Sequence, residues 1–328
     1  MDVSVIVPTR NRARTMQTTL EHLAAQQTGG RFDYEVIISD NGSTDDTRRV
    51  VQQMAMRFPA PLVYVSEIRP GKPFAVNTAV TRARGTLLVF TDDDALADPG
   101  WLAAMWQCLQ DTGAEAIGGR VLPRWVGVEP GWVTDQVQQH LGTIGCIDLG
   151  GERLQMSPNA NKKFWWVGSN IAVRREAFAR YGAFDERMVR GQDVELFERY
   201  RRAGARIFYE PAAVVRHLVG KERLTPEAFR AWYATMGYYR AYVTPWRPLH
   251  LLTIVPVSWF EEVSWLVWAW CRTERLPETF WQRLNYECRL RACWSQFVHR
   301  LQMWPQGCAA VFGRLSSMPA AAQVHHGA

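Results

Sequence analysis

The chain has 328 residues, of which 47% are hydrophobic and 21% are charged. This is ordinary globular usage, which excludes a disordered or fibrous chain, and the length suits one large or two medium units. The formal net charge of +6 is uneven, because residues 221–328 hold 12 Lys and Arg against 7 Glu, together with 9 of the 15 Trp. A basic, Trp-rich end favours a membrane surface or an acidic partner.

Signals for secretion or membrane insertion are weak. The six Cys are scattered without CxxC or zinc-ligand spacing, which fits a reducing compartment. The start, Met1–Arg10, lacks a charged segment followed by an apolar run, so we predict no signal peptide. Residues 248–271 are the most doubtful stretch, but Glu261, Glu262 and Pro256 argue against a spanning helix. We therefore expect a cytoplasmic protein, peripheral at most on the cytoplasmic face of the membrane.

The first hundred residues alternate between strand and helix patterns. Apolar, β-branched runs predict strands at 3–7, 34–39, 62–65 and 86–91. Helical spacing predicts helices between them, the last at 73–84, with Pro73 in its first turn and Gly85 just past its end. The order βαβαβαβ with right-handed crossovers predicts an α/β fold with a parallel, doubly wound sheet.

After Pro99 the pattern is less regular. The apolar spacing predicts three more helices and two more strands, at 101–110, 175–181 and 192–203 and near 116–122 and 206–209. Aromatic residues recur at helical spacing in the last hundred residues, as at Phe229, Trp232 and Tyr233. This favours a helical appendage packed on the rest, with docking to an anionic membrane surface as the alternative.

Polar residues follow three of the predicted strands. Pro8-Thr9-Arg10-Asn11-Arg12 follows the first, Asp40-Asn41-Gly42-Ser43 the second, and Asp92-Asp93-Asp94 the fourth. Ligands of open parallel sheets bind beyond the carboxyl ends of the strands, so we expect these residues to form one site. For Asp40 alone, an Asx turn is the alternative to binding a base or ribose.

The acidic triplet 92–94 is the sharpest of these features. Adjacent carboxylates next to a buried strand raise one another's pKa unless a cation neutralises them. Mg²⁺ or Mn²⁺, with phosphate oxygens and water as further ligands, would remove this cost and stabilise a diphosphate leaving group. Arg10, Arg12, Lys72 and Arg84 are candidates to bind phosphates. The alternatives are a solvated acidic loop and solvated surface charges.

Several segments in this order resemble glycosyltransferase family 2: Val5–Asn11, Ile38–Thr47, Ala83–Asp94, Gly168–Arg175, Phe184–Asp185 and Gly191–Leu196. The match extends from residue 3 to about His217, two thirds of the chain. It implies the GT-A fold, with a Rossmann-like, mainly parallel sheet, and an inverting transferase that uses a nucleotide-diphosphate sugar. Residues 1–115 would bind the donor, 116–225 would bind the acceptor and carry the base, and 226–328 would be a helical, Trp- and Arg-rich C-terminal region.

The resemblance places the nucleoside of the donor against Pro8, Thr9, Asn11 and Asp40, and the ribose against Asp92. Three further residues are donor-binding candidates. Asp93 belongs to the acidic triplet, Lys72 directly precedes the predicted helix at 73–84, and Asn77 lies within that helix. Asp94 would bind the metal. His217, in Val-Val-Arg-His, falls where many relatives place a metal-contacting His, although a lone His is as often structural.

Asp193 falls where the family carries its catalytic base. It also lies at the start of a predicted helix, where its carboxylate caps free N–H groups. Such hydrogen bonds lower the pKa of a carboxylate and weaken it as a base. Relatives usually have Glu before this Asp, whereas this chain has Gln192, which removes a negative neighbour and should lower the pKa of Asp193 further.

The predicted acceptor side contains Trp165, Trp166, Gly168 and Asn170. Aromatic faces pack against the CH surfaces of sugars, and core packing is the alternative for one of the two Trp. Processive members of family 2 usually have several membrane spans and a Gln-x-x-Arg-Trp motif after the base. The sequence shows neither, which favours the addition of one sugar to a hydroxyl of a glycan or lipid-linked acceptor.

Two other functions remain as alternatives to a glycosyltransferase. A sugar nucleotidyltransferase is disfavoured because no Gly-rich phosphate loop follows the first strand. A catalytically silent scaffold in a membrane-associated complex is disfavoured by the intact acidic triplet and Asp193. Nothing in the sequence indicates a nucleic-acid partner.

Overall fold

The computed structural model describes residues 1–127, 144–156, 166–188, 190–244, 253–274 and 280–309. The chain divides into two compact units, Met1–Lys221 and Glu222–Ala328. Each unit is described by itself.

The first unit is built on one mixed sheet. Its described part contains nine strands: β1 (Val3–Thr9), β2 (Tyr34–Asp40), β3 (Leu62–Ser66), β4 (Leu87–Phe90), β5 (Ala95–Ala97), β6 (Ala116–Val126), β7 (Leu154–Met156), β8 (Ile171–Arg174) and β9 (Ile207–Gly220). Their order is β3-β2-β1-β4-β8-β6-β9-β5, and β7 pairs with β9. Strands β1 to β4 are parallel, whereas β8 is antiparallel to its two neighbours β4 and β6.

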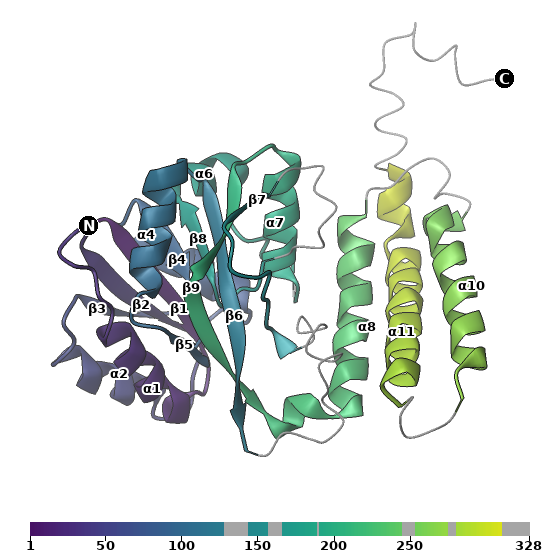
Figure 1. Cartoon of the computed structure of the whole chain (residues 1–328), viewed down its shortest axis with the longest axis horizontal. Coiled ribbons are helices and arrows are strands. Elements are labelled where there is room, and N and C mark those ends of the chain that lie inside the picture. The colour runs from purple at the N-terminus through teal and green to yellow at the C-terminus, as the bar shows by residue number, and fades with distance from the viewer. Residues whose placement is uncertain (128–143, 157–165, 189, 245–252, 275–279, 310–328) are drawn as a thin grey trace, which may run out of the picture. The chain divides into compact units, whose positions relative to one another are not determined.

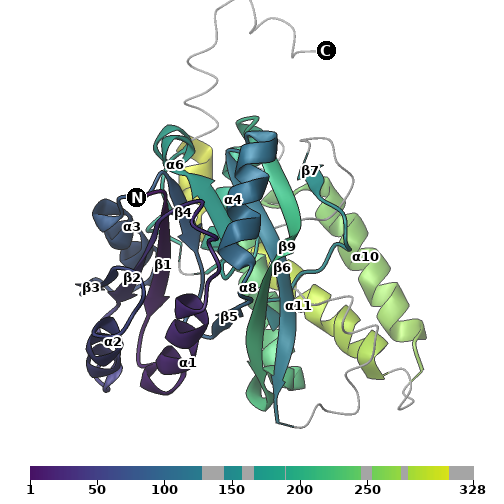
Figure 2. The same cartoon turned by 60° about the vertical axis from the view of Figure 1, so that its left-hand side comes forward.

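Helices cover both faces of this sheet (Figures 1 and 2). Helices α1 (Ala13–Ala24), α2 (Thr47–Ala55) and α4 (Trp101–Thr112) pack with the strands in the main core. Helices α3 (Lys72–Arg82) and α6 (Arg175–Tyr181) lie on the other face, where Phe90 packs against Phe178. Helix α7 (Gln192–Arg202) lies beside α6, since Tyr200 packs against Tyr181.

The central strands are buried on both faces. Every residue of β1, β2 and β4 is buried, which explains why their sequences are nearly continuous apolar runs rather than alternating ones. The predicted parallel, doubly wound order of the first hundred residues is confirmed by the pairing of β1 with β2 and β4, and of β2 with β3.

Strand β9 is much longer than the predicted strand at 206–209. Its pairing with β6 shifts register, because Gly119 pairs with Glu210 but Arg120 pairs with Val214. The three extra residues on β9 begin with Pro211, a residue that sheets accept at bulges. This bulge interrupts the alternation of side chains, and the continuation of β9 to Gly220 was therefore missed.

The second unit is helical, as predicted. Its described part contains α8 (Pro226–Val243), α10 (Val257–Arg272) and α11 (Phe280–Gln302), and the short 3-10 helix η2 (Lys221–Leu224) crosses the boundary between the units. Helix α11 packs against both α8 and α10 (Figure 1). Gly237 permits the close approach of α8, because a Cβ there would lie 2.6 Å from the Cβ of Ser295 on α11. No helix in the described ranges combines the length and apolar character needed to cross a bilayer.

Candidate active site at the strand ends

The carboxyl ends of β1, β2 and β4 lie next to one another. Thr9 at the end of β1 is the register partner of Asp40 at the end of β2. The N–H of Thr91, just after β4, donates to the carbonyl of Ile6 in β1 at 3.1 Å. The fold therefore brings the predicted donor-binding residues of these strand ends to one edge of the sheet.

Asn11 joins two loops at this edge. Its backbone lies in the left-handed region (φ 54°), which Asn tolerates better than most residues. Its Oδ1 accepts from the N–H of Thr44 at 2.7 Å, and its own N–H donates to Ser43 Oγ at 2.8 Å. Asn11 thus holds the loop after β1 against the loop after β2, and so shapes the predicted donor edge.

Asp40 is buried at the end of β2. Its Oδ1 accepts from the N–H of Ser43 at 2.7 Å, and its Oδ2 accepts from the hydroxyl of Tyr64 at 2.6 Å. Burial and this bond to Asp40 raise the pKa of Tyr64 to about 12, so the hydroxyl remains a donor. A carboxylate has about four acceptor positions, which leaves Asp40 able to accept from a ligand. Tyr64 was missed, and its phenol in the otherwise apolar β3 was the available signal.

The acidic triplet follows β4 directly. The side chains of Asp93 and Asp94 are nearly buried. Burial raises the pKa of Asp93 to about 6, Asp94 and Asp92 add to this, and the Thr9 hydroxyl and Arg12 oppose it. Arg12 Nε lies 3.6 Å from Asp93 Oδ1, and Arg12 Nη2 lies 3.8 Å from Asp94 Oδ2. Arg12 therefore partly neutralises the triplet.

Asp94 and His217 come together through the pairing of β5 with β9. Ala95 is the register partner of His217, and the N–H of Leu218 donates to the carbonyl of Asp94 at 2.9 Å. His217 Nε2 then lies 3.2 Å from Asp94 Oδ1, and both side chains are buried. Gly145 leaves room for the imidazole, since a Cβ there would lie 3.3 Å from His217 Cε1.

A carboxylate oxygen and an imidazole nitrogen at this spacing fit two positions of one divalent ion. Within the described ranges, no group of three or more His, Cys, Asp and Glu is arranged to hold a metal. A site built on Asp94 and His217 would thus take its other ligands from phosphate oxygens and water, as Mg²⁺ and Mn²⁺ sites of nucleotide-binding proteins commonly do.

Asp193 lies in the first turn of α7 and is held by two backbone donors. Its Oδ2 accepts from the N–H of Gly168 at 2.8 Å, and its Oδ1 accepts from the N–H of Val194 at 2.9 Å. A Cβ on Gly168 would lie 3.2 Å from Asp193 Oδ2 and 3.4 Å from Lys72 Nζ. Lys72 Nζ is also 2.5 Å from Asp92 Oδ1. The predicted base and Asp92 of the predicted donor edge therefore both lie near one ammonium group.

The expected low pKa of Asp193 was wrong. Burial raises the pKa of this carboxyl, and Asp92 acts in the same direction. The charge of Lys72 and the N–H donors of Gly168 and Val194 lower it, as expected from the sequence, but burial outweighs them. A carboxylate with a raised pKa is a stronger base, which suits proton abstraction from a hydroxyl.

Of the two Trp residues predicted to bind the acceptor, only Trp166 lies within the described residues. Trp165 lies outside the described residues. Trp166 is buried, and its ring packs edge-on against Phe197 and Tyr200 of α7, with ring centroids 5.2 and 5.8 Å away. For Trp166 these contacts support the core-packing alternative, because a buried ring offers no face to a sugar.

Asn170 is also buried, just before β8. Its Nδ2 donates to the carbonyls of Arg120 and Ala213, both at 2.8 Å, and its Oδ1 accepts from Trp101 Nε1 at 2.8 Å. Both amide hydrogens and the amide oxygen thus bind protein groups from β6, the β9 bulge and α4. Acceptor binding by Asn170 stays a prediction, and these contacts support a structural role instead.

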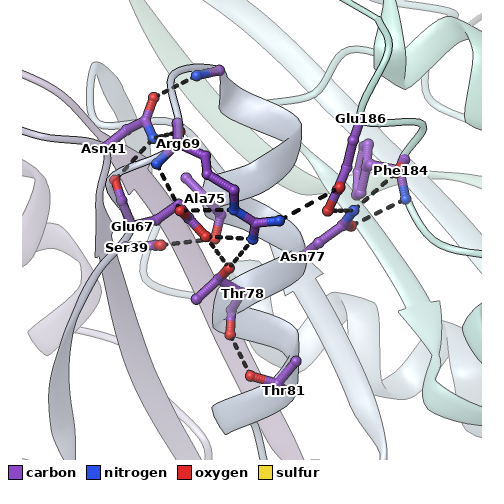
Figure 3. Close-up of polar contacts among 11 residues, drawn as sticks. Ser39, Asn41, Glu67, Arg69, Ala75, Asn77, Thr78, Thr81, Phe184 and Glu186 are labelled. Atoms are coloured by element: carbon purple, nitrogen blue, oxygen red, sulfur yellow. Dashed lines mark hydrogen bonds and ion pairs between the residues drawn. The ribbon is translucent and has the colours of Figure 1, made fainter.

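Asn77 is turned towards the segment that precedes α7 (Figure 3). Its Nδ2 donates to the carbonyl of Phe184 at 2.9 Å and to Glu186 Oε1 at 3.2 Å, and its Oδ1 accepts from the N–H of Phe184 at 3.2 Å. The amide of Asn77 thus joins α3 to residues 184–186. Donor binding by Asn77 stays a prediction.

A second set of contacts beside Asn77 was missed from the sequence (Figure 3). Glu67 is buried and accepts from Arg69 Nη2 at 2.6 Å and from Thr78 Oγ1 at 2.5 Å, and these bonds, chiefly those from Arg69, lower its pKa to about 2. Arg69 Nη1 lies 3.7 Å from Glu186 Oε2.

Asn41 fixes the loop that contains Arg69, since its Nδ2 donates to the carbonyl of Arg69 at 2.7 Å and its Oδ1 accepts from the N–H of Gly71 at 2.8 Å. From the sequence, Asn41 was expected only as part of an Asp-Asn-Gly turn.

The model of the family described as "Glycosyl transferase family 2" matches residues 4–182. Glycosyltransferase AglE of Haloferax volcanii is 26% identical over 202 residues, which are 62% of this chain and 62% of AglE. Glucosyl-dolichyl phosphate glucuronosyltransferase of the same organism is 26% identical, over 66% of this chain and 69% of the relative. Succinoglycan biosynthesis protein ExoM of Rhizobium meliloti is 26% identical over 68% of each chain.

Two solved structures share the fold. Residues 1–349 of TarS from S. aureus, in complex with UDP, superpose with a TM-score of 0.52 at 17% identity, covering 94% of this chain and 92% of that one. The mannosyltransferase PcManGT from Pyrobaculum calidifontis, in complex with GDP-Man and Mn²⁺, gives a TM-score of 0.50 at 22% identity, covering 98% and 76%. The predicted GT-A fold is confirmed.

Replacing Asn170 distinguishes a role in acceptor binding from a structural role. Asn170→Ala would leave the buried N–H of Trp101 and the carbonyls of Arg120 and Ala213 without this partner. We expect the free energy of unfolding to fall by about 3 kcal/mol, measured by urea denaturation. An unchanged unfolding midpoint with a raised KM for the acceptor would instead make Asn170 an acceptor-binding residue.

Proposed function

Because the chain belongs to glycosyl transferase family 2, we propose that it transfers one sugar from a nucleotide-diphosphate sugar to a hydroxyl of a glycan or lipid-linked acceptor. The names of two relatives, a glucosyl-dolichyl phosphate glucuronosyltransferase and a succinoglycan biosynthesis protein, support this class of acceptor. The transfer inverts the anomeric carbon in a single displacement.

The donor binds at the ends of β1, β2 and β4. The free acceptor positions of Asp40 suit the N–H groups of a base, while Pro8, Thr9 and the loop held by Asn11 surround the nucleoside. The ribose lies against Asp92, and Asp93 lines the same edge. The UDP and GDP-Man in the titles of the two structural neighbours support a nucleotide-diphosphate donor.

A divalent ion at Asp94 and His217 completes the donor site. The 3.2 Å separation of their ligand atoms and their burial support this assignment. Mn²⁺ fits better than Mg²⁺, because imidazole nitrogen is a softer ligand than the oxygens that Mg²⁺ prefers. When bound, the ion neutralises the charge that develops on the leaving diphosphate.

Asp193 is the general base. It takes the proton of the acceptor hydroxyl as the oxygen bonds to the anomeric carbon and the bond to the diphosphate breaks. The observation that carries this assignment is a carboxylate with a raised pKa, oriented by the N–H groups of Gly168 and Val194. Through Lys72 it lies next to Asp92 of the donor edge. No protein nucleophile is needed.

Asp193→Asn should lower kcat by about 10²–10⁴, because the amide cannot accept the proton. Donor affinity, measured by calorimetry, should be unchanged. Glu198→Gln is the matched control, since it removes a carboxylate from the same helix on a side chain that pairs with Arg201.

Normal turnover by the Asn variant would refute the base assignment. A wild-type protein that transfers from no donor would support the silent scaffold. Release of pyrophosphate from a nucleoside triphosphate and a sugar phosphate would support the nucleotidyltransferase.

Metal and donor binding should be coupled through Asp94. We expect Mn²⁺ to strengthen UDP or GDP binding at least tenfold in the wild type and to have little effect in Asp94→Asn. A nucleotide at about a hundred times its Kd adds about 2.7 kcal/mol to the free energy of unfolding, which a thermal-shift assay detects. Asp98→Asn is the control, because Asp98 lies at the other end of the short strand β5 and pairs with Arg216. Equal Mn²⁺ dependence in all three proteins would exclude Asp94 as a ligand.

Residues 226–328 also provide a peripheral membrane contact. Trp265 and Trp268 on α10 are about half exposed, and guanidinium groups lie over both rings, Arg289 at 5.5 Å and Arg272 at 4.8 Å. Aromatic rings with cationic neighbours suit the interface of an anionic bilayer. The predicted location at the cytoplasmic face of a membrane remains part of this proposal.

Vesicle co-sedimentation tests the membrane contact. The double variant Trp265→Ser/Trp268→Ser should bind vesicles of phosphatidylcholine and phosphatidylglycerol at least tenfold more weakly than the wild type. The reason is that it lacks the two aromatic rings whose transfer from water to the membrane favours binding. Trp294→Ser on α11 is the control, since its ring is also exposed. Equal binding by all three proteins would refute a contact through α10.

A further inference from the structure

Lys72 lies near two carboxylates that come from different parts of the chain. It is the first residue of α3, directly after Gly71, whose φ of 135° is available to glycine but rarely to other residues. Its Nζ is 2.5 Å from Asp92 Oδ1 at the end of β4. Asp193 is the second carboxylate, since a Cβ on Gly168 would lie 3.4 Å from Lys72 Nζ and 3.2 Å from Asp193 Oδ2, and the charges of Lys72 and Asp193 act on each other.

We propose that Lys72 is a positioning residue for the base: its ammonium pairs with Asp92 and, through its charge, keeps the nearby Asp193 ionised and correctly oriented for the acceptor hydroxyl. This inference rests on the proposed function of Asp193. It differs from donor binding by Lys72, because the effect is exerted on the base and is present before any donor binds.

The charges that face Asp193 come from four elements. Lys72 on α3 and the backbone N–H groups of Gly168 and Val194 favour the ionised carboxylate, whereas burial and Asp92 after β4 oppose it. On its own helix, Glu195 is paired with Arg199 at 2.8 Å. Lys72 therefore supplies the opposing positive charge nearest to the base, and its own pKa is raised because Asp92, Asp193 and Asp94 outweigh its desolvation.

Gly168 makes this arrangement possible. Its N–H holds Asp193 Oδ2 at 2.8 Å, and the missing side chain leaves the space that the ammonium and the carboxylate share. A Cβ there would lie 3.2 Å from Asp193 Oδ2, which is tighter than ordinary van der Waals contact, and 3.4 Å from Lys72 Nζ. Gly168 thus contributes to the same arrangement, because its N–H binds the Asp193 carboxylate and its lack of a side chain leaves room for Lys72.

The pH dependence of kcat/KM measures the base in the free enzyme. An opposite charge at this range lowers the pKa of a carboxyl by about 1–3 units, so removing it raises that pKa. Lys72→Met and Lys72→Gln should therefore shift the acid limb of the profile upward by about one pH unit or more. Lys72→Arg, which keeps the charge, should leave the limb within about half a unit of the wild type. Lys221→Met is the matched control for charge loss, because Lys221 is exposed and lies in η2, directly after β9.

The outcomes separate this inference from the proposed function. A shift in both neutral variants, with none in Lys72→Arg and Lys221→Met, supports it. An unmoved acid limb in Lys72→Met and Lys72→Gln, with nucleoside diphosphate binding weakened at least tenfold, would overturn it and leave Lys72 as a donor ligand only. Full activity of Asp193→Asn would instead refute the base assignment, whatever the Lys72 variants do.

Discussion

The repulsion between carboxylates gathered at one edge of the sheet is the constraint that organises this site. Asp92, Asp93 and Asp94 follow β4, and Asp193 approaches them from α7. At close range and out of water, such groups cannot all ionise without partners. Each has one nearby: Lys72 pairs with Asp92 and its charge also acts on Asp193, Arg12 lies beside Asp93 and Asp94, and His217 lies beside Asp94. A diphosphate donor would add more negative charge to this edge, which is the physical reason for proposing a divalent ion there.

The topology of the sheet delivers these partners from distant parts of the chain. Arg12 comes from the loop after β1, and Lys72 from the start of α3. Strand β8 is antiparallel between β4 and β6, so the loop that precedes it brings Gly168 to the carboxyl end of β4. The long β9 pairs with β5 and places His217 opposite Ala95, next to the triplet. The antiparallel strands therefore supply Gly168, which holds the proposed base, and His217, the proposed metal ligand, while the parallel ones supply the proposed donor edge.

This division also explains what the sequence could predict. Residues at the ends of the parallel strands were predicted as a site from the sequence alone, because uninterrupted apolar runs fix the strands and the strand-end rule places their polar neighbours together. Asp193 and His217 were proposed only through the resemblance to family 2, since a bulge hides β9 and an acidic residue at a helix start also has a capping role. Trp166 and Asn170 fit a sugar site and a protein core equally well as residue types, and only burial distinguishes the two. The approach of Lys72 to Asp193 joins residues of α3 and α7 next to Gly168 and leaves no periodic pattern in the sequence.

Helix α3 connects the proposed donor edge to the proposed base. Lys72 at its start pairs with Asp92 and lies near Asp193, while Asn77, five residues further on, binds Phe184 in the segment that leads to α7. The loop before α3 is fixed in turn by Asn41 and by the Glu67–Arg69 pair, and Arg69 also reaches Glu186 (Figure 3). A base held this way does not depend on the donor to be oriented, because hydrogen bonds within the protein fix it beforehand. Preorganised electrostatics of this kind reduce the rearrangement needed in the transition state, and a single helix that touches both sides achieves it with few contacts.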